Sequence, residues 1–314
     1  MNHPLVSVVI PNYNHARFLK ERIDSVINQT YKNFEIIILD DNSSDNSTNI
    51  IKQYESNPKV SKIVYNIENS GSTFKQWEKG IDLAKGDYIW IAESDDSAFP
   101  EFLQTLITQL EQFPNAILAF SHSYLINSES KYLKKDLHKN SGNSIFLHNG
   151  KRFASEVLTM GNYIYNASMV VFRRSVYYQI EKESYQQFRS CGDWVFWMNA
   201  CLHGDVVEVC QKLNCFRQHN DKVTVKAGKT GRDWQEVSCI LLYFIDLLQL
   251  KGIHKHIFIG KWTNDIHLSK NENKQQTINN NQKVFGGSKI DILLYRLSKL
   301  LKIIRNQSLS LLAW

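Results

Sequence analysis

Short apolar runs alternate with segments of helical spacing through the first 125 residues. Continuous apolar runs predict buried parallel strands at residues 5–10, 34–39, 62–66, 88–91 and 116–121. Between them, apolar residues recur every three or four positions, as at Leu19, Ile23 and Val26, which predicts helices. Strands that alternate with helices indicate an α/β fold with a mostly parallel sheet flanked by helices.

Local signals set the ends of several predicted elements. Ser43-Ser44-Asp45 is expected to cap the second helix, and Pro100 to open the fourth. The third helix is expected at about residues 73–84, with Gly86 as its carboxyl-terminal cap. A further helix is predicted from Trp194 onward.

The regular alternation ends near residue 125. Residues 127–149 include polar stretches, and residues 167–172 are a shorter strand candidate. Residues 271–289, rich in Asn, Gln and Lys, indicate a linker. We therefore expect a sheet half at residues 1–125, an appended half at 126–225 and a helical extension at 226–314.

The last predicted helix is basic and amphipathic. Its apolar face is formed by Ile290, Leu293, Leu294, Leu297, Leu301 and Ile304, and cations occupy Lys289, Arg296, Lys299, Lys302 and Arg305. One hypothesis is that this face packs on the protein's own core. The alternative is that residues 289–314 lie on an anionic membrane surface as a peripheral anchor.

Composition excludes several classes of protein. The chain has 314 residues, 43% of them apolar, which is enough for a large core. Its formal charge of +6 is spread along the sequence, so we expect no nucleic-acid partner. Without a signal peptide or an apolar run of about 20 residues, we expect a cytoplasmic protein, peripheral on the inner face of the membrane if the terminal helix binds there. The five cysteines form no CxxC pair and indicate neither a zinc site nor a disulfide framework.

Two predicted strands end in paired carboxylates. Asp40 and Asp41 close the second strand, and Asp95 and Asp96 follow the fourth. Ligands of α/β sheets bind at the carboxyl ends of the strands, and hard cations prefer oxygen ligands. A metal-bound diphosphate fits this edge of the sheet. The alternative is that the acids only stabilise turns, since Asp is a common turn residue.

Several segments, in this order, resemble family 2 glycosyltransferases with a GT-A fold. The similar segments are Val6–Asn14, Leu39–Asp45, Asn69–Gly71 with Lys79-Gly80, Glu93–Asp96, Cys191–Trp194 and Phe216–His219. The resemblance covers about residues 5–225. It implies an inverting transfer of a sugar from a nucleotide-sugar donor to a glycan or lipid-linked glycan, in bacterial surface polysaccharide biosynthesis. It also assigns residues 1–125 to the nucleotide-sugar donor and residues 126–225 to the acceptor and the catalytic base.

The resemblance implies donor contacts at the ends of the first two strands. Asp41 would accept a hydrogen bond from the nucleotide base, because an ionised carboxylate only accepts such bonds. Its alternative role is to cap the following turn, for which Asp40 is also available. The base and ribose pocket would be lined by Pro11, Asn12 and Tyr13. Tyr13 would stack there or serve as a packing residue.

The resemblance also implies a divalent cation, Mn²⁺ or Mg²⁺, beside the donor diphosphate. Asp96 would ligate it, with Asp95 as a supporting carboxylate and sugar contact, in a variant of the usual Asp-x-Asp motif. His219 would ligate the metal or donate to phosphate, and Arg217 would add positive charge. Lys75 would be a further phosphate contact, although its loop is one residue longer than usual.

Asp193 matches the family's catalytic base, which removes the proton of the acceptor hydroxyl. The alternative is that Asp193 is the N-cap of the helix that follows. Burial would raise its pKa toward the useful range. A non-catalytic nucleotide-binding or carbohydrate-binding protein of the same fold is the competing function. A dinucleotide oxidoreductase is disfavoured, because Pro11-Asn12-Tyr13-Asn14 stands where Gly-x-Gly-x-x-Gly would follow the first strand.

Overall fold

A computed structural model describes residues 3–138, 142–219, 232–268, 279 and 286–311. The chain forms two compact units. The first comprises residues 1–154 and 162–220, and the second comprises residues 155–161 and 221–314.

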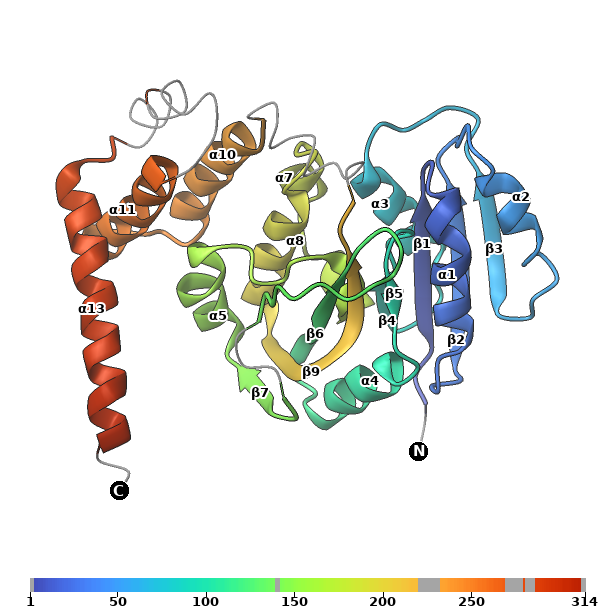
Figure 1. Ribbon diagram of the computed structural model, residues 1–314, viewed down its shortest axis with the longest axis horizontal. Coiled ribbons are helices and arrows are strands. Elements are labelled where there is room, and N and C mark those ends of the chain that lie inside the picture. The colour runs from blue at the N-terminus through green and yellow to red at the C-terminus, as the bar shows by residue number, and fades with distance from the viewer. Residues whose placement is uncertain (1–2, 139–141, 220–231, 269–278, 280–285, 312–314) are drawn as a thin grey trace. The chain divides into compact units, whose positions relative to one another are not determined.

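The first unit is built on a nine-stranded sheet with the order β3-β2-β1-β4-β8-β6-β9-β5, and β7 pairs with β9 (Figure 1). The strands are β1 Val6–Asn12, β2 Phe34–Asp40, β3 Val60–Tyr65, β4 Tyr88–Ile91, β5 Ser97–Ala98, β6 Ala116–Ile126, β7 Ile145–His148, β8 Val170–Arg173 and β9 Asp205–Arg217. Strands β1 to β4 pair in parallel, as do β6 and β9, while β8 runs antiparallel between β4 and β6. The predicted α/β class is confirmed.

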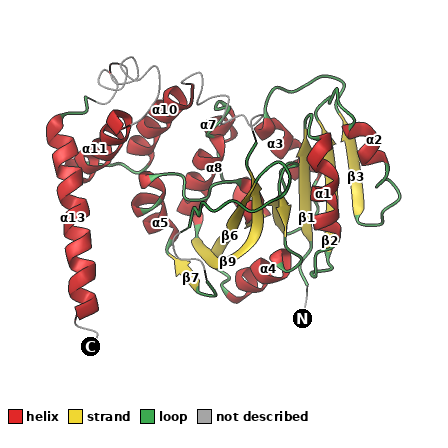
Figure 2. Cartoon of the chain, viewed as in Figure 1, coloured by secondary structure: helices red, strands yellow, loops and turns green. Residues whose placement is uncertain are grey.

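Helices flank this sheet (Figure 2). They are α1 Ala16–Ile27, α2 Ser47–Lys52, α3 Thr73–Leu83, α4 Phe102–Gln112, α5 Gly150–Glu156, α6 Arg174–Tyr177, α7 Lys182–Gln186 and α8 Gly192–Ala200. One core cluster joins the residues of β1 and β2 that point to the same face, such as Val8 and Ile36, to Leu19 of α1 and Leu103 of α4. Strands β1, β2 and β4 are buried along their whole length, which explains their continuous apolar sequence.

Gly86 is not the cap of the third helix, so that prediction is wrong. Helix α3 ends at Leu83 with Ala84 in an extended conformation. A Cβ atom at Gly86 would lie 2.6 Å from both the Leu5 carbonyl oxygen and the Ser7 amide nitrogen. Gly86 is therefore required because the chain passes directly against β1.

Other predicted boundaries also shift. Asn46 is the N-cap residue of α2, while Asp45 accepts a hydrogen bond from the Ser47 amide. Helix α4 begins at Phe102, two residues after Pro100. The strand candidate at residues 167–172 is a 3-10 helix at Ala167–Met169 followed by β8. Strands β5, β7 and β9 were not predicted, because they lie in polar or mixed sequence and depend on long-range pairing.

The second unit contains α10 Arg232–Leu247, α11 Gly252–Leu268 and α13 Lys289–Leu311. Helix α13 packs on α11. The predicted linker at residues 271–289 lies mostly outside the described residues, and its last residue, Lys289, begins α13. None of the helices in the described ranges combines the length and apolar character needed to cross a bilayer.

Candidate functional site

The carboxyl ends of β1, β2 and β4 meet at one edge of the sheet, as predicted. Asn12 at the end of β1 pairs with Asp40 at the end of β2. On the other side of β1, the Ala92 amide just after β4 donates to the Val9 carbonyl oxygen at 2.8 Å. The acidic turns at residues 40–41 and 95–96 thus follow neighbouring strand ends.

Asp40 stabilises the turn after β2, the role for which the sequence made it available. Its Oδ2 accepts the Ser43 amide at 3.0 Å, and its Oδ1 accepts Asn12 Nδ2 at 2.8 Å. Asn14, with a φ of 56°, accepts the amide of Ser44 at 2.8 Å. These bonds fix the loops after β1 and β2 to each other.

Asp41 is buried and fastens the loop before α3. Its Oδ1 accepts Asn66 Nδ2 at 2.6 Å, the Ser70 amide at 2.9 Å and Gln76 Nε2 at 3.0 Å. Its Oδ2 accepts the Ser70 hydroxyl at 2.8 Å. Sequence reasoning missed Gln76, whose position on a helix gave no sign that its side chain turns inward.

The other predicted donor contacts differ in exposure. Pro11 and Asn12, the last two residues of β1, are buried. Tyr13 is 49% exposed, so it is not a buried packing residue. Lys75 is exposed in the first turn of α3. Lys79, one helical turn further on, donates to Asn66 Oδ1 at 2.5 Å and so joins the network around Asp41.

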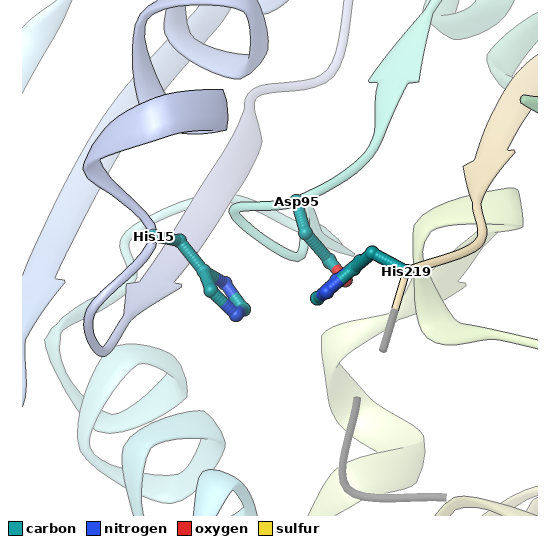
Figure 3. Close-up of side chains that lie close together, drawn as sticks. All are labelled: His15, Asp95 and His219. Atoms are coloured by element: carbon teal, nitrogen blue, oxygen red, sulfur yellow. The ribbon is translucent and has the colours of Figure 1, made fainter. Parts of the chain in front are cut away.

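Three metal-ligand side chains converge beside the second acidic turn: His15 from the loop after β1, Asp95 from the turn after β4 and His219 just after β9 (Figure 3). Their candidate ligand atoms lie within 4.8 Å of one another. His219 Nε2 is 2.9 Å from Asp95 Oδ2, and His15 Nδ1 is 2.8 Å from Ser94 Oγ. Sequence reasoning missed His15. Its one available signal is its place directly after the first motif.

Asp96 is more deeply enclosed than Asp95. It is 1% exposed, its Oδ1 accepts the Arg217 amide at 2.9 Å, and its Oδ2 accepts Asn166 Nδ2. The geometry therefore favours the reverse of the predicted assignment, with Asp95 facing the two histidines and Asp96 supporting the turn.

Arg217 is not arranged as a phosphate contact, contrary to the prediction. Its side chain is fully buried and lies over the Phe18 ring. Nε donates to the Asp95 carbonyl oxygen at 2.6 Å, and Nη2 donates to Glu21 Oε2 at 2.7 Å. Nη1 donates to the Asn127 carbonyl oxygen at 2.9 Å. The guanidinium thus holds the acidic turn against β9 and α1.

The charge of the acidic turn is partly compensated within the protein. Burial, assisted by the charge of Asp95, raises the pKa of Glu93 to about 8. Trp77 of α3 donates to Glu93 Oε1 at 2.8 Å. The buried Arg22 donates through Nε to the Glu93 carbonyl oxygen at 2.9 Å, and its guanidinium attracts Asp95 and Asp96. At neutral pH the protonated Glu93 carries no charge, so it does not repel Asp95 and Asp96.

Asp193 lies in the first turn of α8, whose N-cap residue is Cys191 and not Asp193. Its Oδ1 accepts the Trp194 amide at 2.8 Å, and its Oδ2 accepts Asn162 Nδ2 at 3.3 Å. Burial raises the pKa of Asp193 to about 7 against the lowering effect of these bonds. The side chain keeps partial exposure. A carboxylate of this pKa is suited to general base catalysis near neutral pH.

Asp193 is connected to the acidic turn by a short segment. Asn162 binds Asp193, and Asn166 binds Asp96. These asparagines are four residue steps apart, so their Cα atoms lie within about 14 Å of each other. Neither asparagine has a local signal in the sequence, because each acts through a contact with a distant residue.

A family model described as glycosyl transferase family 2 matches residues 7–180. An uncharacterized glycosyltransferase of Haemophilus influenzae is 28% identical over 229 residues, which cover 71% of this chain and 68% of that protein. A putative teichuronic acid biosynthesis glycosyltransferase of Bacillus subtilis, TuaG, is 36% identical over 118 residues, covering 38% and 45%.

Solved structures support the fold. S. aureus TarS 1–349 in complex with UDP-GlcNAc has a TM-score of 0.66 at 18% identity, covering 89% of this chain and 81% of that one. The mannosyltransferase PcManGT from Pyrobaculum calidifontis, in complex with GDP-Man and Mn2+, has a TM-score of 0.54 at 13% identity, covering 96% and 81%. Since the family model spans more than half of the sequence and the sheet carries its motifs on neighbouring strand ends, this chain belongs to glycosyltransferase family 2 and has a GT-A fold.

Proposed function

We propose that this glycosyltransferase is metal-dependent and inverting, and that it moves a sugar from a nucleotide-sugar donor to a hydroxyl of a glycan or lipid-linked glycan. The observation that carries the proposal is the convergence of His15, Asp95 and His219 beside a turn that is linked to Asp193. The similarity to the putative teichuronic acid biosynthesis glycosyltransferase of Bacillus subtilis supports a role in bacterial surface polysaccharide biosynthesis.

The converging side chains fit a divalent cation. Two imidazoles and a carboxylate offer nitrogen and oxygen ligands within 4.8 Å of one another. The carboxylate is a ligand type that suits Mn²⁺, and the imidazoles favour a transition metal ion over Mg²⁺. We propose that His15, Asp95 and His219 hold the ion. When bound, it neutralises the diphosphate of the donor as that group leaves. Arg217 and Asp96 keep the turn in place through their hydrogen bonds.

Asp193 acts as the base in this proposal. Its ionised carboxylate takes the proton of the acceptor hydroxyl, whose oxygen forms the new bond to the anomeric carbon. The bond from that carbon to the diphosphate oxygen breaks, and its electron pair leaves with the nucleoside diphosphate. One displacement inverts the anomeric centre.

Asp41 serves the nucleotide in this proposal, with Pro11, Asn12 and Tyr13 lining the base and ribose pocket. A ring N–H would bind at Asp41 Oδ2, which now accepts the Ser70 hydroxyl. That hydroxyl has a second acceptor at the Ser72 carbonyl oxygen, 3.1 Å away, so the exchange leaves it bonded. Lys75 stays a proposed phosphate contact, and its exposure leaves its ammonium group able to reach a ligand.

We also propose that α13 lies on the anionic inner surface of the cytoplasmic membrane. Its contact with α11 includes two polar pairs: Asp291 binds His256 at 2.7 Å, and Arg296 binds Asn264 at 2.9 Å. Ile290, Leu293, Leu297, Leu300 and Leu301 are exposed. Leu294 of the predicted apolar face is half-buried, and the side chain of Ile304 lies outside the described residues. Exposed leucines beside Lys289 and Lys299 suit an interfacial helix.

Thermal-shift measurements with nucleoside diphosphates and Mn²⁺ test the proposed donor site, because a ligand of the folded state raises its melting temperature. UDP is the first candidate, since a solved neighbour binds UDP-GlcNAc. Asp193→Asn should keep the shift and lose sugar transfer. If no nucleoside diphosphate gives a shift, the donor proposal is wrong. If Asp193→Asn keeps full activity, Asp193 is not the base.

A further inference from the structure

A second cluster of metal-ligand side chains lies in the first unit and shares no residue with the donor site. It consists of His122 from β6 with Glu208 and Cys210 from β9. All three are buried, and their candidate ligand atoms lie within 4.8 Å of one another. Imidazole nitrogen, carboxylate oxygen and thiolate sulfur are the three kinds of ligand that zinc takes in proteins.

Glu208 is the centre of this cluster. His122 Nε2 lies 2.9 Å from its Oε1, and His148 Nε2, from β7, lies 2.8 Å from its Oε2. The Tyr163 hydroxyl donates to Oε1 at 2.8 Å. A second imidazole therefore stands on the opposite oxygen of the same carboxylate, which offers a fourth ligand. The partly exposed His148 gives an ion access to the cluster.

The backbone brings these ligands together through an irregular ladder. Glu208 and Cys210 are two residues apart on β9 and point to the same face. Ser121 pairs with Val209, but the next residue of β6, His122, pairs with Lys212. Cys210 therefore lies in a bulge. Bulges redirect side chains and are common beside functional sites.

The cluster is also well enclosed. Glu208 is 6% exposed, and His122 and Cys210 are both 0% exposed. His138 stacks on His122 with ring centroids 3.9 Å apart.

We infer that His122, Glu208, Cys210 and His148 form a binding site for a zinc-class transition metal ion. Tetrahedral zinc with bonds of about 2.0–2.3 Å holds neighbouring ligand atoms about 3.5 Å apart. His122, Glu208 and Cys210 already lie close together, whereas His148 contacts Glu208 alone and joins the other ligands only after side-chain movement. Each imidazole would bind through Nε2 and keep its proton on Nδ1, while Cys210 would release its proton to solvent as the sulfur–metal bond forms. Binding at such a site stabilises the folded state.

Cobalt titration of the full chain after chelator treatment tests the inference. Binding of Co²⁺ to Cys210 should produce a thiolate-to-cobalt charge-transfer band that grows to saturation as Co²⁺ is added. Cys210→Ser should abolish the band. Cys201→Ser removes a buried thiol outside the cluster and should keep it, as should Asp95→Asn. Absence of the band in the wild-type protein, or its persistence in Cys210→Ser, would overturn the inference.

A second variant guards against misfolding of Cys210→Ser. His148 is partly exposed, so His148→Ala disturbs packing less. It should weaken Zn²⁺ binding, measured by competition with a chromophoric chelator, by about tenfold or more. The matched control is His203→Ala, at an exposed histidine outside the cluster, and it should leave affinity unchanged. Equal affinity of His148→Ala and the wild-type protein would remove His148 from the site.

Discussion

Asp95 Oδ2 and His219 Nε2 lie 2.9 Å apart, which joins the turn after β4 to the residues that follow β9. Asp96, the next residue, turns the other way and accepts the Arg217 amide at 2.9 Å. The two adjacent carboxylates therefore have different roles. Asp95 faces the proposed metal site, and Asp96 stabilises the turn.

Asp95→Asn should weaken metal binding without a large loss of stability. Replacing an anionic ligand removes charge from the proposed site, so the Mn²⁺ concentration for half-maximal transfer should rise by at least about tenfold. Mn²⁺ titration of donor turnover measures this. An unchanged Mn²⁺ requirement would contradict the role of Asp95.

Asp96→Asn should instead lower stability. The new amide cannot accept hydrogen bonds from both the Arg217 amide and Asn166 Nδ2, so a buried donor is left unsatisfied. The free energy of unfolding should fall by about 1–3 kcal/mol. Urea denaturation measures the change. If Asp96→Asn is as stable as the wild type but needs more Mn²⁺, then Asp96 is the metal ligand and Asp95 the support of the turn.

The rate of sugar transfer should rise with pH through about 7, because Asp193 must be ionised to act as the base and its pKa is raised to about 7. The pH profile of kcat/KM for the acceptor measures this. A flat profile between pH 5 and pH 9, with chemistry limiting the rate, would argue against Asp193.

The raised pKa of Asp193 also predicts that the stability of the fold falls as pH rises, whereas the transfer rate increases. Between the unfolded pKa of 3.8 and the folded pKa of about 7, the folded protein binds more protons at Asp193 than the unfolded chain does. The contribution of Asp193 to stability is complete below the unfolded pKa and is lost as pH rises through about 7. Asp193→Asn should therefore gain stability relative to the wild type from pH 5 to pH 8 in urea denaturation. A constant difference would contradict the raised pKa.

Gly86→Ala should destabilise the protein by about 1–3 kcal/mol, because its Cβ would press on the backbone of β1. Gly142→Ala is the control, since no atom lies within 4 Å of the Cβ position there, and it should change stability by no more than about 0.5 kcal/mol. Thermal unfolding of both variants measures the difference. Equal melting temperatures would refute the close approach.

The double variant Leu293→Glu with Leu297→Glu should release the protein from vesicles that contain anionic lipid. Glutamate on the exposed face of α13 removes apolar contact and is repelled by the headgroups. Vesicle flotation measures binding. Leu268→Glu, at an exposed leucine of α11, is the control and should float like the wild type. Failure of the wild-type protein to float would end the membrane proposal.

The sequence by itself determined the strands β1, β2 and β4 and the acidic turns at their ends. Strands buried on both faces must be apolar throughout, so their pattern is readable without knowledge of their neighbours. The motifs that contain Asp41, Asp95 and Asp193 are also short, so they can be identified without knowledge of their neighbours in space.

Only the tertiary structure decided which side chains share a site. His15 joins Asp95 and His219, Arg217 becomes a buried support, and His122 meets Cys210 across a bulge. Burial, ionisation and the choice of hydrogen-bond partner depend on residues that are far apart in the chain. A local pattern cannot encode them, because the same aspartate is a ligand or a support according to what packs against it.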